Sequence, residues 1–174
     1  MIETIESINW ALSFMGITCA LFVIFLIYDM SHAQRLKSLI ARFGMRLAFI
    51  SIIASSAMTL IYSEIFGIIP CGLCWFERVA LYPQALLFGM AMYYKDTRMP
   101  RYGIGLSIGG LIVSLYHHYI QMGGSEFIKC PAAGADCAKR FLFEFGFMTF
   151  PLLSAILFSF LIVLYVYLLK TDRN

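Results

Sequence analysis

The chain has 174 residues, of which 61% are hydrophobic and 13% are charged, whereas an ordinary soluble domain has about 25% charged residues. This composition excludes an ordinary soluble protein and supplies apolar residues for several membrane-spanning helices of about 20 residues each. The formal charge of +3 is too small to indicate binding to nucleic acid. Any chemistry must sit in the membrane or at its surface, because the short connections that remain cannot build a soluble domain.

Five apolar segments follow one another along the chain, and each is long enough to cross a bilayer as a helix. We place these spans at residues 8–28, about 47–69, 71–94, 102–122 and 145–169. The first segment is too long for the core of a signal peptide and is preceded by Glu3 and Glu6 instead of cations, so we expect it to stay in the membrane. The sequence therefore predicts an all-α integral membrane protein with five transmembrane helices.

The Lys and Arg residues are concentrated in alternate connections between these spans. Nine of them fall in residues 29–46, in residues 95–101 and after residue 169. The opposite face receives four, namely Arg78, Lys129, Lys139 and Arg140. Because cations close to span ends prefer the cytoplasmic side, this pattern predicts an N-terminus outside and a C-terminus in the cytoplasm. It also supports the count of five, since adding or removing one span would mix the two groups.

Four of the five cysteines fall on the predicted outer face. Cys71 and Cys74 form the motif C-G-L-C before the third span, while Cys130 and Cys137 bracket C-P-A-A-G-A-D-C in the only long external loop. The outer face of a bacterial membrane is oxidising, so disulfides can form there. Cys19 lies within the first span, and we interpret it as a small buried apolar residue.

The C-x-x-C motif has the features of a redox pair. Its two sulfur atoms can form an exposed bond that a thiolate attacks, and Pro70 predicts that the motif opens a helix, whose N-terminus favours the thiolate form. Arg78 follows Cys74 by four residues and Cys71 by seven, so all three lie on one helical face. We interpret Arg78 as a functional arginine. The alternative is an interfacial anchor that reaches the head groups or pairs with Glu77.

Two other interpretations of the cysteine pairs are static disulfides and a four-cysteine zinc site. Zinc would require both pairs to converge, and the neighbouring cations, among them Arg78 and Arg140, give no reason to favour a dication. A bond between Cys130 and Cys137 would close a small loop and stabilise the fold by only about 2–3 kcal/mol. Such a bond is better suited to exchange with the thiolate of another protein than to bracing the fold.

Two disulfides that pass electrons to each other need a final acceptor. The chain has no motif for a nucleotide or for covalent haem, and a lipid-soluble quinone is the acceptor most compatible with a small membrane protein. Side chains that could stack on a quinone ring and bind its oxygen atoms gather at the outer end of the fourth span: Tyr116, His117, His118, Tyr119 and Gln121. Such side chains also gather at membrane interfaces without a ligand.

These motifs together resemble the DsbB family of membrane disulfide oxidoreductases, especially its short BdbC-like members. The resemblance rests on P-C-G-L-C-W-F-E-R from residue 70, L-Y-P from residue 81, L-Y-H-H-Y-I-Q from residue 115, C-P-A-A-G-A-D-C from residue 130 and F-G-F-M-T-F-P from residue 145. It covers roughly residues 45–170. We therefore divide the chain into an extra N-terminal transmembrane helix with a basic cytoplasmic connection (residues 1–44) and a four-helix redox core (residues 45–174).

The resemblance implies a thiol:quinone oxidoreductase in the cytoplasmic (inner) membrane of a prokaryote. Its partner would be a DsbA-like thioredoxin-fold protein outside the cytoplasm, and its electrons would go to ubiquinone or menaquinone, with no metal and no nucleotide. By motif position, Cys130 would form the mixed disulfide with the partner, and Cys137 would resolve it toward Cys71.

The same resemblance implies a quinone site at the other cysteine of the C-x-x-C motif. Cys74 would face the quinone, and Arg78 would stabilise the Cys74 thiolate and a quinone oxygen atom. A histidine at 117 or 118 would assist, and the resemblance leaves open which one; Gln121 lies in the same motif.

Two features depart from the family pattern, and two other functions remain as alternatives. The first span lies outside the four-helix pattern, and the external cysteine loop is shorter than in the longer DsbB members. A relative of vitamin K epoxide reductase would also use two cysteine pairs and a quinone, but the string C-W-F-E-R and a C-x-x-C motif at a helix start disfavour it. A membrane scaffold or transporter with two inert disulfides is the alternative without enzyme activity.

Overall fold

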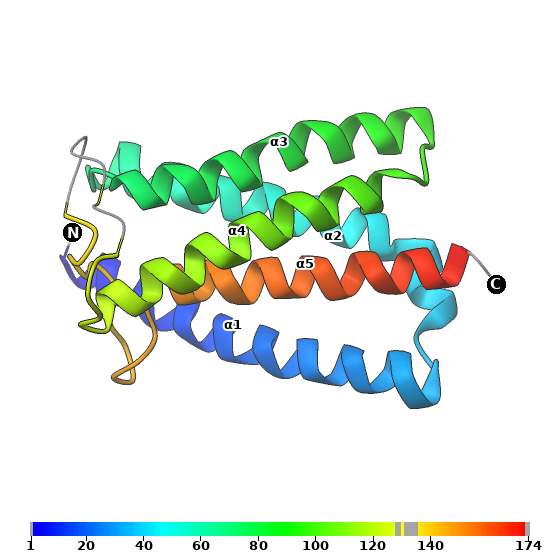
Figure 1. Ribbon diagram of the computed structural model, residues 1–174, viewed down its shortest axis with the longest axis horizontal. Helices are drawn as coiled ribbons and strands as arrows, with labels where there is room; N and C mark the ends of the chain where they lie inside the picture. The colour runs from blue at the N-terminus through cyan, green and yellow to red at the C-terminus, as the bar shows by residue number, and fades with distance from the viewer. Residues whose placement is uncertain (1, 128–129, 131–135, 173–174) are drawn as a thin grey trace.

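The computed structural model is a bundle of five helices that lie side by side along one direction (Figure 1). It describes residues 2–127, 130 and 136–172, so Lys129, counted above among the external cations, lies outside this part. The helices are α1 (Ile2–Tyr28), α2 (Lys37–Leu60), α3 (Gly72–Tyr94), α4 (Met99–Gln121) and α5 (Phe150–Asp172). Short π-helical turns at Asp29–Ala33 and Ile61–Ile65 extend α1 and α2.

Three of these helices are long and apolar enough to cross a membrane, judged by length and composition. They are Ile5–Ala33, Lys37–Ile65 and Phe150–Thr171, which contain α1, α2 and α5 with their π-helical extensions. Helices α3 and α4 run beside them but bury several polar side chains. The expectation of an all-helical protein with membrane-spanning helices is confirmed, and the count of five spans stays a prediction.

Two helix boundaries differ from the sequence-based expectation. Helix α2 begins at Lys37, well before residue 47, because its basic first turns continue the helix beyond the apolar segment. Helix α5 begins at Phe150 and not at residue 145, because Phe145 and Gly146 have φ angles of 56° and 78° and form a turn. The hydroxyl of Thr149 then accepts a hydrogen bond from the amide of Leu152 at 3.3 Å, which satisfies a free amide in the first turn of α5.

A buried hydrogen-bond network around Gln84 joins α3, α4 and α5. The Oε1 atom of Gln84 accepts hydrogen bonds from Tyr165 Oη at 3.0 Å and from Ser107 Oγ at 3.3 Å, and its Nε2 atom donates to the Ala80 carbonyl at 2.8 Å. Gly103 on α4 permits close packing, because a Cβ atom there would lie 2.7 Å from the Tyr165 ring. Polar groups inside a lipid-embedded bundle need such internal partners, so the network fixes how these three helices face one another.

Helix α1 packs along α5, and polar contacts fix it near both of its ends. Near its start, the buried Asn9 side chain accepts a hydrogen bond from Tyr62 Oη at 2.6 Å and donates one to the Phe141 carbonyl at 3.3 Å. After its end, the Asp29 carboxylate accepts a hydrogen bond from Tyr167 Oη at 2.6 Å and also binds two backbone amides of the turn into α2. The first helix is therefore an integral part of the bundle.

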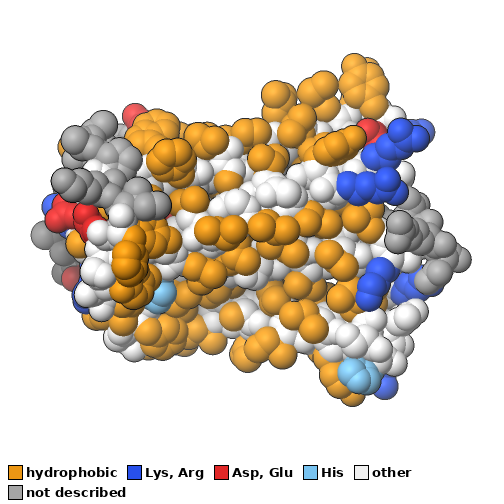
Figure 2. Space-filling model, in the orientation of Figure 1, with side chains coloured by type: hydrophobic (Ala, Val, Ile, Leu, Met, Phe, Trp, Pro, Cys, Tyr) orange, Lys and Arg blue, Asp and Glu red, His pale blue; other side chains and the backbone are white. Residues whose placement is uncertain are grey.

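The two ends of the bundle differ in charge and in chemistry. The α1–α2 connection, the α3–α4 turn and the C-terminus lie at one end, and most of the visible Lys and Arg side chains gather there (Figures 1 and 2). The N-terminus, the start of α3 and the long connection between α4 and α5 lie at the other end (Figure 1). Both cysteine pairs thus lie at the end opposite to these cations.

We expect Asn9→Ala to destabilise the protein by about 2 kcal/mol, because two buried hydrogen bonds are lost and their partners stay unpaired. Tyr62→Phe removes only one of these hydrogen bonds, so it should lower the free energy of unfolding by about 1 kcal/mol. Thermal and chemical unfolding of the purified protein in detergent measures both values. Equal stability of Asn9→Ala and the wild type would contradict a role of Asn9 in holding α1.

Candidate functional site

The C-x-x-C motif forms the first turn of α3. Cys71 has an extended backbone and caps the helix, since its Sγ atom accepts a hydrogen bond from the amide of Cys74 at 3.3 Å. The two sulfur atoms lie 2.8 Å apart as free thiols. Cys71 is only 4% exposed, whereas Cys74 is partly exposed. The pair is therefore positioned to form and break a bond, with Cys74 as the more accessible sulfur.

His117 of α4 contacts the buried sulfur atom of this pair. Its Nε2 atom lies 3.5 Å from Cys71 Sγ, and its Nδ1 atom lies 2.9 Å from Glu77 Oε1. The histidine is 1% exposed. Because a carboxylate only accepts hydrogen bonds, Nδ1 donates to Glu77, which turns Nε2 toward the thiol. A thiol, an imidazole and an orienting carboxylate in this order form an arrangement that activates a nucleophile.

The structure separates the two histidines that the sequence left equivalent. His118 turns away from the cysteine pair, and its Nδ1 atom lies 2.8 Å from the hydroxyl of Thr149 at the start of α5. Glu77 was missed as a site residue, because the sequence suggested only a pairing with Arg78. Its position three residues after Cys74, on the same helical face, was the signal that could have found it.

Arg78 is buried beside the motif but has other partners than the sequence suggested. Its Nη2 atom donates to the Thr59 carbonyl of α2 at 3.0 Å, and its Cζ atom lies 5.2 Å from the centre of the Trp75 ring. The side chain is 8% exposed, so it does not reach out to head groups, and Glu77 binds His117 instead. The alternative that Arg78 pairs with Glu77 is therefore wrong. Among the described residues, no hydrogen bond joins Arg78 to a cysteine.

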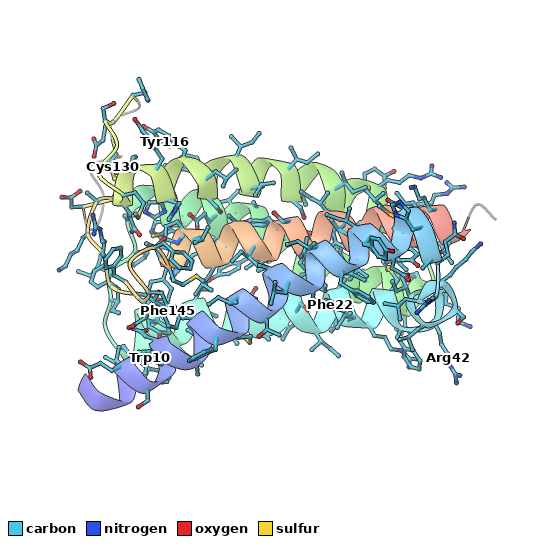
Figure 3. All side chains as sticks on the ribbon, turned by 90° about the horizontal axis from the view of Figure 1, so that it is seen from below. Trp10, Phe22, Arg42, Tyr116, Cys130 and Phe145 are labelled. Atoms are coloured by element: carbon cyan, nitrogen blue, oxygen red, sulfur yellow. A yellow bond between two sulfur atoms is a disulfide. The ribbon has the colours of Figure 1, made fainter. Side chains whose placement is uncertain are left out.

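The second cysteine pair lies against the first. Cys130 and Cys137 form a disulfide with Cα atoms 6.1 Å apart. Cys137 and Cys71 belong to one buried cluster with Leu73 and Ile120, and the other cysteine of each pair packs against this cluster. Figure 3 shows Cys130 at the same end of the bundle as Tyr116 of α4. The fold thus brings sulfur atoms from two distant stretches of the chain together.

Gln121 ties the last turn of α4 to the residues around the second pair. Its Nε2 atom donates to the Lys139 carbonyl at 3.1 Å, and it also lies 3.5 Å from the Cys137 carbonyl and 3.5 Å from His117 Nε2. Its Oε1 atom is buried and has no hydrogen-bond partner in the described part of the chain. One side chain therefore connects the imidazole beside Cys71 with the backbone of Cys137.

The same residues bear on whether the site could hold a metal ion. The ligand atoms of Cys71, Cys74 and His117 lie within 4.8 Å of one another, which is three of the four ligands that zinc needs. Cys130 and Cys137 are bonded to each other and have no free thiolate. A zinc site made of all four cysteines therefore disagrees with this structure.

Fold and site together define a helical membrane protein with two adjoining cysteine pairs. The sequence model of the family described as disulfide bond formation protein DsbB matches residues 41–168 of this chain. The chain therefore belongs to the DsbB family. This membership implies an oxidoreductase that takes part in disulfide bond formation. The match begins within α2, so α1 lies outside the matched residues.

Curated relatives agree with this family. A probable disulfide formation protein C 2 of Bacillus anthracis is 38% identical over 125 residues, which cover 70% of this chain and 89% of the relative. The disulfide bond formation protein C of Bacillus subtilis (strain 168) is 37% identical over 117 residues, which cover 67% of this chain and 84% of the relative. No solved structure matches the chain. The resemblance to BdbC-like members of the family is confirmed.

We expect Gln121→Leu to loosen the segment that follows Cys137. The substitution keeps most of the side-chain volume but removes the donor to Lys139, and loss of about 1 kcal/mol of local stability raises amide exchange about fivefold. Hydrogen exchange of residues 137–142, followed by mass spectrometry, measures this change. Gln34→Leu, the same substitution at an exposed position at the opposite end of the bundle, should leave that segment unchanged, and an equal effect of both variants would contradict the tether.

Proposed function

We propose that this protein is a thiol:quinone oxidoreductase that reoxidises a DsbA-like thioredoxin-fold protein outside the cytoplasm. The observation that carries this proposal is the single buried cluster in which Cys137 and Cys71 lie together. Thiol–disulfide exchange needs only that a thiolate reaches a disulfide sulfur. With the family known, this function fits the chain better than that of a vitamin K epoxide reductase.

The exchange starts at the second pair. A thiolate of the reduced partner attacks Cys130, which is partly buried, and Cys137 leaves as a thiolate. Cys137 then attacks Cys71 in its bonded form, and the bond to Cys74 breaks so that Cys74 leaves as a thiolate. The partner's second thiolate releases the oxidised partner from Cys130, and Cys130 then attacks Cys137. This restores the Cys130–Cys137 bond, and the partner's two electrons remain on Cys71 and Cys74 as a dithiol.

His117 handles the proton of Cys71 in this scheme. The Cys71–Cys74 bond re-forms when the dithiol loses two electrons and two protons to the acceptor. In that step the Nε2 atom of His117 accepts the proton of the Cys71 thiol, and Glu77 holds the ring in the orientation that keeps Nε2 toward the sulfur. Gln121 keeps the backbone of Cys137 close to the same imidazole. The attack of Cys137 and the proton transfer at Cys71 therefore take place within one set of contacts.

The surface beside Cys74 fits a quinone that arrives from the lipid. A quinone supplies an acceptor for two electrons and two protons. Trp75 and Phe76 are 52% and 54% exposed next to Cys74, and they offer flat apolar surface at this level of α3. The guanidinium of Arg78 lies under Trp75 and provides donors for a quinone oxygen. Cys74, the more accessible sulfur, would face the ring.

The charge distribution supports an orientation with the cysteine pairs on the outer face. We propose that all five helices cross the cytoplasmic membrane of the bacterium, since α3 and α4 run beside the three apolar helices. The end with most of the Lys and Arg side chains would then lie in the cytoplasm, as these residues prefer. The partner would reach the Cys130 loop from outside.

We expect Cys74→Ser and Cys130→Ser to abolish electron transfer from a reduced thioredoxin-fold oxidase to quinone. Each removes a sulfur atom through which both electrons must pass. Stopped-flow mixing of the purified, quinone-loaded protein with the reduced oxidase measures quinone reduction. Cys19→Ser, which removes the cysteine inside α1, is the control and should keep the wild-type rate. Full activity of Cys74→Ser would favour inert disulfides, and one zinc ion per reduced chain would favour a metal site.

We expect His117→Asn to lower the rate of quinone reduction by about 100-fold, the lower range for loss of a general acid–base group. His118→Asn is the matched control, because this histidine contacts Thr149 and should leave the rate nearly unchanged. The same stopped-flow assay compares the two variants. Equal losses, or a larger loss for His118→Asn, would contradict the assignment of the proton-handling group to His117.

A further inference from the structure

A second site lies at the end of the bundle opposite to the cysteines. It is a pocket of about 410 Å³ between α2, the α3–α4 turn and the last turns of α3 and α5. Pockets of about 300–1,000 Å³ are of the size that holds small-molecule ligands. Figure 3 shows Arg42, one of its lining residues, at the far end from Cys130. The redox function uses none of the residues that form this pocket.

Three cations line the pocket. Arg42 and Arg46 are one turn apart on α2, and Lys95 caps the end of α3. None of the three forms an ion pair in the described part of the chain. Asp96 is the acidic residue in the lining, and its Oδ1 atom accepts a hydrogen bond from the amide of Arg98 at 2.8 Å. The pocket therefore has an excess of positive charge with no protein carboxylate bound to it.

Two of these cations, both on α2, lie close to the ring of Phe43. The Cζ atoms of Arg42 and Arg46 lie 5.2 Å and 6.0 Å from the centre of this ring. Like charges four residues apart on a helix repel each other. An anion bound between them removes this repulsion, so their arrangement favours an anionic ligand.

Most of the other residues that line the pocket are apolar. Met45, Met92 and Leu168 contribute apolar surface next to the cations. Thr171 also lines the pocket, and its buried hydroxyl has no hydrogen-bond partner among the described residues. A ligand for this site therefore combines an anionic group, a hydrogen-bond acceptor for the Thr171 hydroxyl and an apolar portion.

We infer that this pocket binds the headgroup of an anionic phospholipid, with its phosphodiester between Arg42, Arg46 and Lys95. Basic pockets between helices on the cytoplasmic side of membrane proteins recognise such headgroups. The acyl chains would cover Met45, Met92 and Leu168, which a soluble phosphate compound would leave in contact with water. The phosphodiester oxygen atoms would accept the hydrogen bond that Thr171 lacks. This inference does not depend on the redox chemistry at the other end.

Native mass spectrometry of the detergent-purified full chain tests the inference by titration with four probes. The probes are dioleoyl phosphatidylglycerol, dioleoyl phosphatidylcholine, glycerol phosphate and inorganic phosphate. We expect phosphatidylglycerol to bind at one saturable site and the other three to bind far more weakly. Arg42→Gln combined with Arg46→Gln should weaken phosphatidylglycerol binding about 30-fold, at about 1 kcal/mol per cation. Lys95→Gln alone should weaken it about fivefold.

The matched control is Arg98→Gln combined with Arg101→Gln, which removes two exposed cations at the same end but outside the pocket. This variant should keep the wild-type affinity, and unfolding temperatures without lipid check that all variants are folded. Equal losses of phosphatidylglycerol affinity in both double variants would mean that general surface charge explains the binding. That result would overturn the site. Equal binding of phosphatidylcholine, or equal binding of glycerol phosphate, would overturn the assignment to an anionic lipid.

Discussion

The contact between Cys71 and His117 is the interaction on which the organisation of the site depends. It joins the first turn of α3 to the last part of α4, and it exists only if the two helices keep their register along the bundle. The buried Gln84 network sets that register farther along the same helices. Apolar contacts are not directional, so they specify the relative orientation of two helices less strictly than hydrogen bonds do. Hydrogen bonds among buried polar groups supply the orientation that reactive geometry requires.

The two cysteines of each pair differ in how exposed they are. Cys71 and Cys137 are buried in one cluster, while Cys74 and Cys130 pack against it from more accessible positions. The buried sulfur atoms are thus shielded from thiols and oxidants other than each other. The accessible ones belong to different elements, Cys74 to the first turn of α3 and Cys130 to the loop between α4 and α5. In the exchange that we propose, electrons that enter at Cys130 reach Cys74 through the two buried sulfur atoms.

Spacing along the chain predicted which residues share a helix face but not which neighbour that face meets. The start of α3 at the C-x-x-C motif and the place of Arg78 on the same helix followed from local signals, and the helical class followed from composition. The choice between His117 and His118 did not, because adjacent residues point about 100° apart on a helix and only packing decides which one faces α3. The start of α5 was placed too early, since an apolar run that includes Phe145 does not reveal the turn at Gly146.

The first helix acts on the site through the segment that follows Cys137. The Asn9 side chain binds the carbonyl of Phe141, and the Trp10 and Phe14 rings pack edge-on against Phe145, with ring centres 5.1 Å and 5.5 Å away. The loop between α4 and α5 is therefore held on one side by Gln121 and on the other by α1. These contacts hold the backbone at Cys137, Lys139 and Phe141, close to where Cys137 packs with Cys71. In this chain α1, which lies outside the family match, takes part in that support.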